Sequence, residues 1–468
     1  MTDRAAARAA LAGAERRVFW LDRPDAPDPA PPLTGTAETD LVVVGAGYTG
    51  LWAAHQALDE DPGRDVLVLE AGRAALGASG RNGGFLDASL THGLANGRSH
   101  FPAELATLVR LGRENYAGLL ADLDRHGIDA AVEQVGEIDV AAAAWQLDGM
   151  AEDADLARSL GEDVEMLDRA ALGAEVASPE HLGGLWHKTH CALVDPGRLA
   201  WGLLAAARRR GARVHEHTAV AGVRDAGEAV VVEGPHLHVR ARRVLLATNA
   251  FPALIAPIRR AVAPVYDHVL VTEPLTASQW DAVGWRRRQG LADAGNRFHY
   301  YRPTPDGRIL WGGWDALYHY GNRVGPDLEQ DDRTALTLAR HFRARFPQLD
   351  GIAFTHRWGG PIATTSRFMF TAGTRLGGKV AWSVGYTGLG VAASRFGARV
   401  ALDLLAGEDT ERTRLAAVRR PPVPFPPEPL RWLAIEATRR ALARADAHDG
   451  RRGPWLRLLD RFGVGFDS

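Results

Sequence analysis

The sequence predicts an α/β fold in which a discontinuous domain alternates along the chain with a second domain built on a mostly antiparallel sheet with helices. Three observations predict it. The apolar run at 41–44 enters a glycine-rich turn and then a helical pattern. A second buried run, at 380–384, does the same far downstream. Between them, 262–320 is rich in strand-like apolar runs, which indicates a lobe inserted into the first.

Composition restricts the functional classes. The chain has 468 residues, 46% of them apolar, which is enough for two domains. A net charge of -2 offers no basic surface, so we expect no nucleic-acid partner. The only cysteine, Cys191, excludes an internal disulfide or a cysteine-based zinc cluster, and we expect no metal site. No segment has the features of a signal peptide or a membrane span, so we expect a cytoplasmic protein without membrane insertion.

The first turn has the spacing G-x-G-x-x-G. Gly45 permits the tight strand-to-helix turn, Gly47 lets a pyrophosphate approach the backbone, and Gly50 lets the helix pack closely on the strand. Glu70 follows 20 residues after Gly50 and is placed to accept hydrogen bonds from a ribose. These residues predict a Rossmann-like βαβ unit that binds FAD or NAD, through Gly45, Ala46, Gly47, Tyr48, Thr49, Gly50, Glu70 and Ala71.

The remaining elements follow in order. Residues 1–20 predict a short helix, and 24–33 a proline-rich connector. Helical spacing covers 102–127, 147–173 and 198–210; short strands follow at 214–223, 229–232 and 236–239, and a strand at 243–247 ends in Thr248-Asn249. The clearest later strands are 265–272 and 308–313, before helices at 330–346 and 391–405. After a proline-rich linker at 421–429, a helix around 430–437 and a segment from Trp455 predict packing or an oligomer contact.

A loop after the second strand combines four glycines with a hydroxyl, a guanidinium and an amide. Such a loop lets backbone lie against a flat ligand. Ser79 is placed to bind a phosphate oxygen, and Arg81 or Asn82 a flavin edge, while the Gly83-Gly84 pair leaves room for a ring. The cofactor contacts expected here are Gly77, Ala78, Ser79, Arg81, Asn82, Gly83 and Gly84.

The second glycine-rich turn lies between the strand at 380–384 and a helix. The helix N-terminus and its amides would face the pyrimidine edge of a flavin, where they stabilise the negative charge of the reduced form. The residues expected to contact the cofactor are Gly385, Tyr386, Thr387, Gly388, Leu389 and Gly390.

Over residues 16–408 the chain resembles the glycine oxidase and D-amino-acid oxidase (DAO) family of FAD-dependent oxidoreductases, in particular its γ-glutamylputrescine oxidoreductase-like branch. The likeness is carried by 44–51, Glu70-Ala71, the loop 77–84, 194–196, 247–250, 302–308 and 385–391. It implies FAD rather than NAD, an interleaved FAD domain with a substrate domain, and oxidation of a carbon-nitrogen bond by hydride transfer to the flavin. It also implies contacts from Thr248 and Asn249, and from the backbone of Val220 near the adenine.

The implied domains are an N-terminal extension (1–37), an FAD-binding domain (38–100, 186–261 and 355–410), a substrate domain (101–185 and 262–354) and a C-terminal helical extension (411–468).

Departures from the family pattern refine the expectation. Gly385-Tyr386 stands where flavin hydroxylases have Gly-Asp, which favours the amine-oxidising branch. Leu389 occupies a position that is His in many relatives. Leu310 stands where sarcosine oxidases have a lysine that assists reaction with oxygen, so dioxygen or another acceptor remains open. Cys191 lies outside the region of covalent attachment, so non-covalent FAD is expected.

Substrate contacts are expected on the strands of the second lobe. Aromatic walls would enclose an amine, and an arginine would clamp a carboxylate. The expected catalytic residues are Tyr301, Arg302, His268 and Trp358; the other candidates are Tyr266, His299, Tyr300, Trp314, His319, His356 and Arg357. The favoured function is oxidation of an amine or amino acid. The alternatives are a 2-hydroxy acid dehydrogenase on the same fold, a flavoprotein subunit of a larger complex, and an NAD-binding protein.

Overall fold

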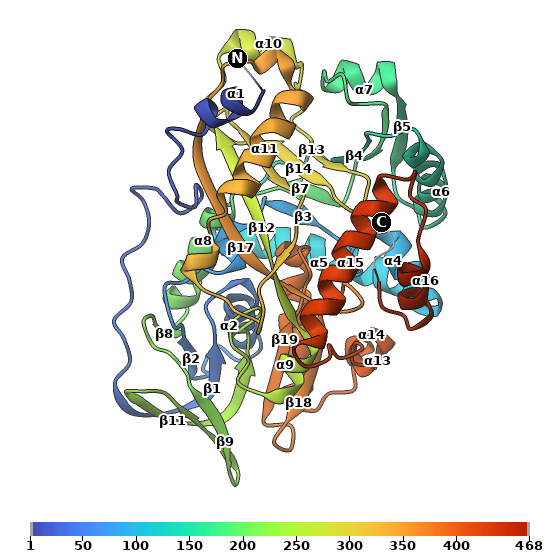
Figure 1. The fold of residues 1–468 in the computed structure, drawn as a ribbon. Helices are drawn as coiled ribbons and strands as arrows, with labels where there is room; N and C mark the ends of the chain where they lie inside the picture. The colour runs from blue at the N-terminus through green and yellow to red at the C-terminus, as the bar shows by residue number, and fades with distance from the viewer. Residues whose placement is uncertain (1–2, 466–468) are drawn as a thin grey trace.

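The computed structural model describes residues 3–465, and two large sheets form its frame (Figure 1). The eight-stranded first sheet contains β1 (Gly35–Val44), β2 (Val66–Leu69), β8 (Arg213–His215), β9 (Gly222–Ala226), β10 (Ala229–Glu233), β11 (Leu237–Leu246), β18 (Thr371–Arg375) and β19 (Val380–Val384). Its parallel strands run in the order β19-β11-β1-β2-β8, and β18 and the β9-β10 pair join antiparallel.

Both faces of the first sheet are covered, which explains why its central strands are continuously apolar. On one face, α2 (Tyr48–Glu60), α5 (Leu105–Arg125), α8 (Pro196–Arg209) and α12 (Gly390–Ala406) pack on Leu41 and Val43. On the other, Val42 and Val44 pack against β9, β10 and the region of α9 (Ala256–Ala261). Because α12 and β19 follow far after β1, the nucleotide-binding part is assembled from distant segments.

The second sheet has nine strands: β4 (Glu137–Ala141), β5 (Val164–Asp168), β6 (Gly183–His187), β12 (Ala263–Thr272), β13 (Gly290–Asp293), β14 (His299–Pro303), β15 (Ile309–Gly313), β16 (Leu317–Tyr318) and β17 (Phe354–Thr364). All its pairs are antiparallel except β4-β13. One face packs on α11 (Asp332–Arg345), where Trp311 contacts the ring of Phe342. Figure 1 shows α11 against this sheet in the upper half of the view.

The smaller elements connect these layers. They are α1 (Asp3–Ala10), α3 (Ala78–Arg81), β3 (Phe85–Asp87), α4 (Leu94–His100), α6 (Trp145–Ser159), α7 (Arg169–Glu175), β7 (Cys191–Leu193), α10 (Ala277–Val283), α13 (Glu411–Arg414), α14 (Ala416–Arg419), α15 (Leu430–Asp446) and α16 (Pro454–Arg461), with short 3-10 turns at 102–104, 326–328 and 347–349. Across residues 3–465, none of the helices combines the length and the apolar character needed to span a bilayer.

The predicted fold class is confirmed: a largely parallel sheet with helices on its face and a largely antiparallel second sheet. Two details differ. The helical pattern expected over 147–173 is interrupted, because Gly161 takes a φ of +78° and residues 164–168 then pair with β6. Strand β17, placed by the predicted bounds largely in the FAD-binding domain, pairs with β12 of the second sheet. The domain bounds otherwise stay a prediction.

Candidate functional site

A cavity of about 1520 Å³ lies between the two sheets and is lined by both glycine-rich turns. Pockets for a single small ligand usually have about 300–1,000 Å³, so this one has room for a large ligand and a second molecule. The predicted cofactor residues line it except for Ala46, Gly50, Gly84 and Gly385.

The first turn has the geometry that the glycine spacing predicts. Gly45 has a φ of +108°, which a side chain would strain. A Cβ at Gly50 would strike the carbonyl oxygen of Gly45, so glycine there lets α2 lie against the turn. The Oγ of Ser79 accepts a hydrogen bond of 2.8 Å from the backbone N–H of Tyr48, the first residue of α2. The N-terminus of α2 and the Ser79 hydroxyl therefore meet where a pyrophosphate is expected.

Glu70 holds the turn from the adjacent strand. Its Oε2 accepts from the N–H of Ala46 at 2.8 Å, and its Oε1 from the N–H of Gly72 at 2.9 Å. Burial raises the pKa of this carboxyl group, although the backbone hydrogen bonds oppose the rise. Val220, Glu70 and Ala71 line the same end of the cavity, which is the end expected to receive adenosine.

The loop 77–84 is held from behind by three buried side chains. Trp358 Nε1 donates to the carbonyl oxygen of Arg81 at 2.9 Å, and Trp20 Nε1 donates to that of Asn82 at 2.9 Å. Arg302 Nη1 donates to the carbonyl oxygen of Gly84 at 3.1 Å. Carbonyl groups of the loop therefore point away from the cavity into donors. This fixes the backbone and leaves the other side of the loop open to a flat ligand.

The second turn is anchored to the end of β11. Asn249 Oδ1 accepts from the N–H of Gly385 at 3.1 Å, and Gly385 takes a φ of +84°. Among the described residues, the buried hydroxyl of Thr248 has no hydrogen-bond partner although it lines the cavity. An unpaired buried hydroxyl is costly, which indicates that a ligand or water group completes it.

These features fit a flavin dinucleotide. The cavity has a glycine turn and a helix N-terminus for the pyrophosphate, an acid for the ribose, an open loop for the ring and an unpartnered hydroxyl. The residues that would hold it are those of the first turn, the loop 77–84 and the turn 386–390.

The four residues predicted to be catalytic, Tyr301, Arg302, His268 and Trp358, do not line the cavity, and their role in catalysis stays a prediction. Arg302 and Trp358 support the loop from its far side. The hydroxyl of Tyr301 lies between His181, Asp293 and Arg345 in the core against α11. His268 is buried near Asp331, and burial lowers its pKa to about 4.

The alternation of side-chain direction along the strands explains why residues such as Tyr301 and His268 lie outside the cavity. Successive side chains point to opposite faces of a sheet, so a choice that is wrong by one residue selects the wrong face. On β12, Val265, Asp267 and Val269 face the cavity, whereas Tyr266 and His268 do not.

On β14 and beyond, Tyr300 and Trp314 face the cavity, whereas Tyr301 does not. Of the wider candidate set, these two are the residues placed at the cavity. Tyr266, His299, His319, His356 and Arg357 lie outside its lining.

Asp267 and Tyr300 form a hydrogen-bonded pair next to the loop 77–84. The hydroxyl of Tyr300 donates to Asp267 Oδ2 at 2.5 Å, and the N–H of His268 donates to Asp267 Oδ1 at 2.8 Å. A Cβ at Gly83 would lie 2.8 Å from the ring of Tyr300, so the ring packs directly on the loop. Burial raises the pKa of Asp267 to about 6, and the hydrogen bond from Tyr300 opposes this rise.

Farther along the cavity, four carboxyl groups and a histidine gather. They are Asp87, Glu137, Asp139 and Asp153, with His187. Burial and the neighbouring carboxylates raise the pKa values of Asp87, Glu137 and Asp153. Burial lowers the pKa of His187, but a hydrogen bond of 3.1 Å with Asp139 and the nearby carboxylates outweigh it and raise the pKa to about 9. None of these residues is marked by a sequence motif, since they come together only through folding.

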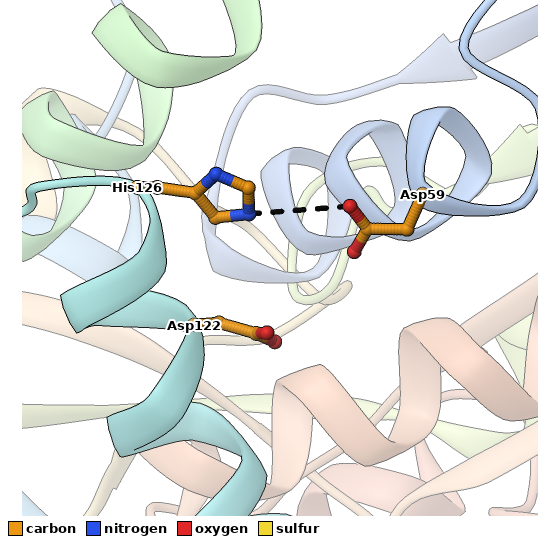
Figure 2. Close-up of side chains that lie close together, drawn as sticks. All are labelled: Asp59, Asp122 and His126. Carbon is orange, nitrogen blue, oxygen red and sulfur yellow. Dashed lines mark ion pairs between the residues drawn. The ribbon is translucent and has the colours of Figure 1, made fainter.

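A separate acidic group lies outside the cavity: Asp59, Asp122 and His126 (Figure 2). His126 Nε2 is 4.0 Å from Asp59 Oδ1. Arg210 Nη2 already lies 2.6 Å from Asp59 Oδ1, and Arg395 Nη2 lies 2.7 Å from Asp122 Oδ2. Because these guanidinium groups neutralise the carboxylates and would repel a cation, we interpret the group as an ion-pair network joining α2, α5 and α12.

Comparisons with known proteins agree with this geometry. Residues 40–404 match the family described as FAD dependent oxidoreductase (DAO). Gamma-glutamylputrescine oxidoreductase of Escherichia coli is 32% identical over 401 residues, which cover 84% of this chain and 89% of that protein. The crystal structure of glycine oxidase from Geobacillus kaustophilus superposes with a TM-score of 0.67 at 18% identity, over 80% of this chain and 96% of that one.

L-proline dehydrogenase from P. horikoshii gives a TM-score of 0.65 at 18% identity, over 81% of this chain and 96% of that one. At such identity these two structures support the fold alone. The match to the family extends over most of the chain and includes both glycine-rich turns. The chain therefore belongs to the DAO family of FAD-dependent oxidoreductases.

Proposed function

We propose that the protein oxidises a carbon-nitrogen bond of an amine or amino acid, giving an imine that hydrolyses. The observation that carries the proposal is Asp267, a carboxyl group that lines the cavity beside the loop 77–84 and whose pKa of about 6 leaves it ionised at neutral pH. Its negative charge attracts an incoming ammonium group. The relatives named for oxidation of γ-glutamylputrescine and of glycine support the same reaction class.

Asp267 also separates this proposal from the alternative of a 2-hydroxy acid. A hydroxy acid carries a carboxylate, which the ionised Asp267 would repel. Two of the arginines that line the cavity have acidic partners: Arg439 Nη1 lies 3.0 Å from Asp315 Oδ1, and Arg297 Nε lies 3.9 Å from Asp446 Oδ2. We therefore favour the amine.

The chain's own residues account for binding and for the proton. FAD, when bound, accepts the hydride. Before that, the ammonium must lose a proton so that a neutral amine presents its C–H bond. Asp267 is placed for this because its carboxyl group lines the cavity beside the loop, and its pKa of about 6 leaves it ionised at neutral pH. Tyr300 fixes its orientation.

We propose that FAD is bound non-covalently, because Cys191 does not line the cavity and its thiol lies 3.3 Å from Glu137 Oε2. The electron acceptor is dioxygen or another oxidant.

Anaerobic mixing of the yellow holoprotein with substrates tests the proposal. Primary amines, γ-glutamyl amines and N-methyl amino acids are compared with 2-hydroxy acids of matched carbon chain. We expect flavin absorbance to bleach with at least one amine and not with the hydroxy acids. Faster bleaching by a hydroxy acid would reverse the assignment. Admitting air afterwards gives the rate of reoxidation by dioxygen.

A further inference from the structure

Residues 421–465, the larger part of the C-terminal extension, form a wall of the cavity. Helix α15 contributes Ala434, Ile435, Thr438, Arg439 and Leu442, which recur at helical spacing and therefore share one face. Arg439 is paired with Asp315 and Glu436. The opposite face is in solvent, where Leu433 is 52% exposed. The sequence predicted packing or an oligomer contact for this segment. The structure shows that it also faces the site.

The wall is fixed at several points. Asp446 Oδ1 accepts from Asn296 Nδ2 at 2.7 Å, close to the end of α15. The N–H of Gly465 donates to the carbonyl oxygen of Ser366 at 3.2 Å, after α16. Helix α16 braces α15, since Trp455 Nε1 donates to the hydroxyl of Thr438 at 3.0 Å. Helices α15 and α16, in red, lie side by side in Figure 1.

The residues of this wall are distinct from those expected to bind the cofactor. The match to the FAD-dependent family ends at residue 404, before the extension begins. The residues expected to bind FAD belong to the first turn, Glu70-Ala71, the loop 77–84, Val220, Thr248-Asn249 and the turn 386–390, and none of them lies in the extension. Side chains of α15 therefore line the cavity outside the expected FAD contacts, where a second molecule would bind, and three of the five are apolar.

We propose that the inner face of α15 determines specificity by binding the hydrocarbon portion of the amine, remote from the carbon-nitrogen bond that is oxidised. This inference rests on the proposed amine function. Ile435 and Leu442 supply apolar area, and Ala434 leaves room between helix and substrate. Each methylene group that reaches the wall increases amine affinity about fourfold, because burying it removes apolar surface from water.

The test measures binding of linear primary amines of increasing chain length to the holoprotein by titration calorimetry, alongside anaerobic flavin reduction. The variants are Ile435→Trp, which narrows the cavity, and Ile435→Ala, which widens it. Leu433→Trp is the matched control on the exposed face of the same helix. FAD content and thermal midpoint confirm that each variant is folded.

For Ile435→Trp we expect at least tenfold weaker binding of long amines and unchanged binding of the shortest. Ile435→Ala shifts the optimum toward longer amines, and Leu433→Trp behaves as the parent. An equal loss at every chain length, or no change at any, overturns the role of α15. Should Ile435→Trp fail to fold, the absence of a shift with Ile435→Ala overturns it. Failure of the proposed function shows separately, as bound amines that never bleach the parent's flavin.

Discussion

At the scale of single residues, Asp267 is the group on which the proposed chemistry depends. Its carboxyl group faces the cavity and has a pKa of about 6. Because the ionised form accepts the proton, kcat/KM should rise as pH rises through about 6. Asp267→Asn should remove this limb and lower kcat/KM about 10²- to 10⁴-fold. Stopped-flow flavin reduction between pH 5 and 9 measures both; an unchanged profile would exclude Asp267 as the acceptor.

The same carboxyl group has a predictable effect on stability. Its pKa in the folded protein, about 6, lies above its ordinary value of 3.8, so folding disfavours the ionised form. Asp267→Asn should therefore raise the free energy of unfolding by about 3 kcal/mol at pH 7, because each unit of pKa shift corresponds to about 1.4 kcal/mol. This increase in the free energy of unfolding is complete above pH 6 and disappears as the pH falls below 3.8. Urea unfolding at pH 7.5 and 3.5 measures it; equal gains at both pH values would contradict the burial argument.

At the scale of the strand, neighbouring tyrosines on β14 should behave oppositely. Tyr300→Phe removes the hydrogen bond that opposes the raised pKa of Asp267, so the acidic limb should move to higher pH. Tyr301→Phe should leave the profile unchanged and cost about 1 to 2 kcal/mol of stability, because Arg345 loses a buried partner. The pH profiles and thermal unfolding of the two variants decide it; a shifted profile for Tyr301→Phe would mean that the strand faces are misassigned.

At the scale of the helix, Gly50 in the first glycine-rich turn should not tolerate a side chain, whereas other helical glycines should. A Cβ at Gly50 would meet the carbonyl oxygen of Gly45, so Gly50→Ala should force α2 away and weaken FAD binding at least tenfold. Gly149→Ala is the matched control, because Gly149 is an exposed helical glycine with open space around it. It should keep FAD and gain up to about 1 kcal/mol from helix propensity. Fluorescence titration of each apoprotein variant with FAD measures the dissociation constants of Gly50→Ala and Gly149→Ala.

At the scale of the whole molecule, the cavity joins segments from both ends of the chain, so FAD should stabilise the two sheets together. At 100 times its dissociation constant, a ligand specific for the folded state adds about 2.7 kcal/mol. Reconstituting the apoprotein should raise its unfolding midpoint by several degrees in a single transition. Calorimetry with and without FAD measures this. A second transition that FAD does not shift would show that the sheets unfold independently.

The sequence predicts the cofactor end of the site better than the substrate end. The cofactor end was predictable because strand, glycine turn and helix are adjacent in the chain, so Gly45, Gly47 and Glu70 are found by local spacing. The substrate end was not. Asp267 and His268 are equally polar neighbours on one strand, and only tertiary packing decides which faces the cavity.

The other residues of the site cannot be identified from local sequence patterns, because they are far apart in the chain. Glu137 and Asp153 meet only after folding, and the inner face of α15 resembles any amphipathic helix until its partner surface is known. Trp358 and Arg302, which the sequence predicts to be catalytic, donate hydrogen bonds to backbone carbonyl groups of the loop 77–84.

The lone thiol has a practical use. Cys191 is 3% exposed, and burial raises its pKa well above the usual range, so it reacts poorly with maleimides under native conditions. A fluorophore can therefore be attached at an introduced surface thiol without first removing a native one. Leu433→Cys, on the solvent side of α15, offers such a thiol, because Leu433 is 52% exposed and does not line the cavity.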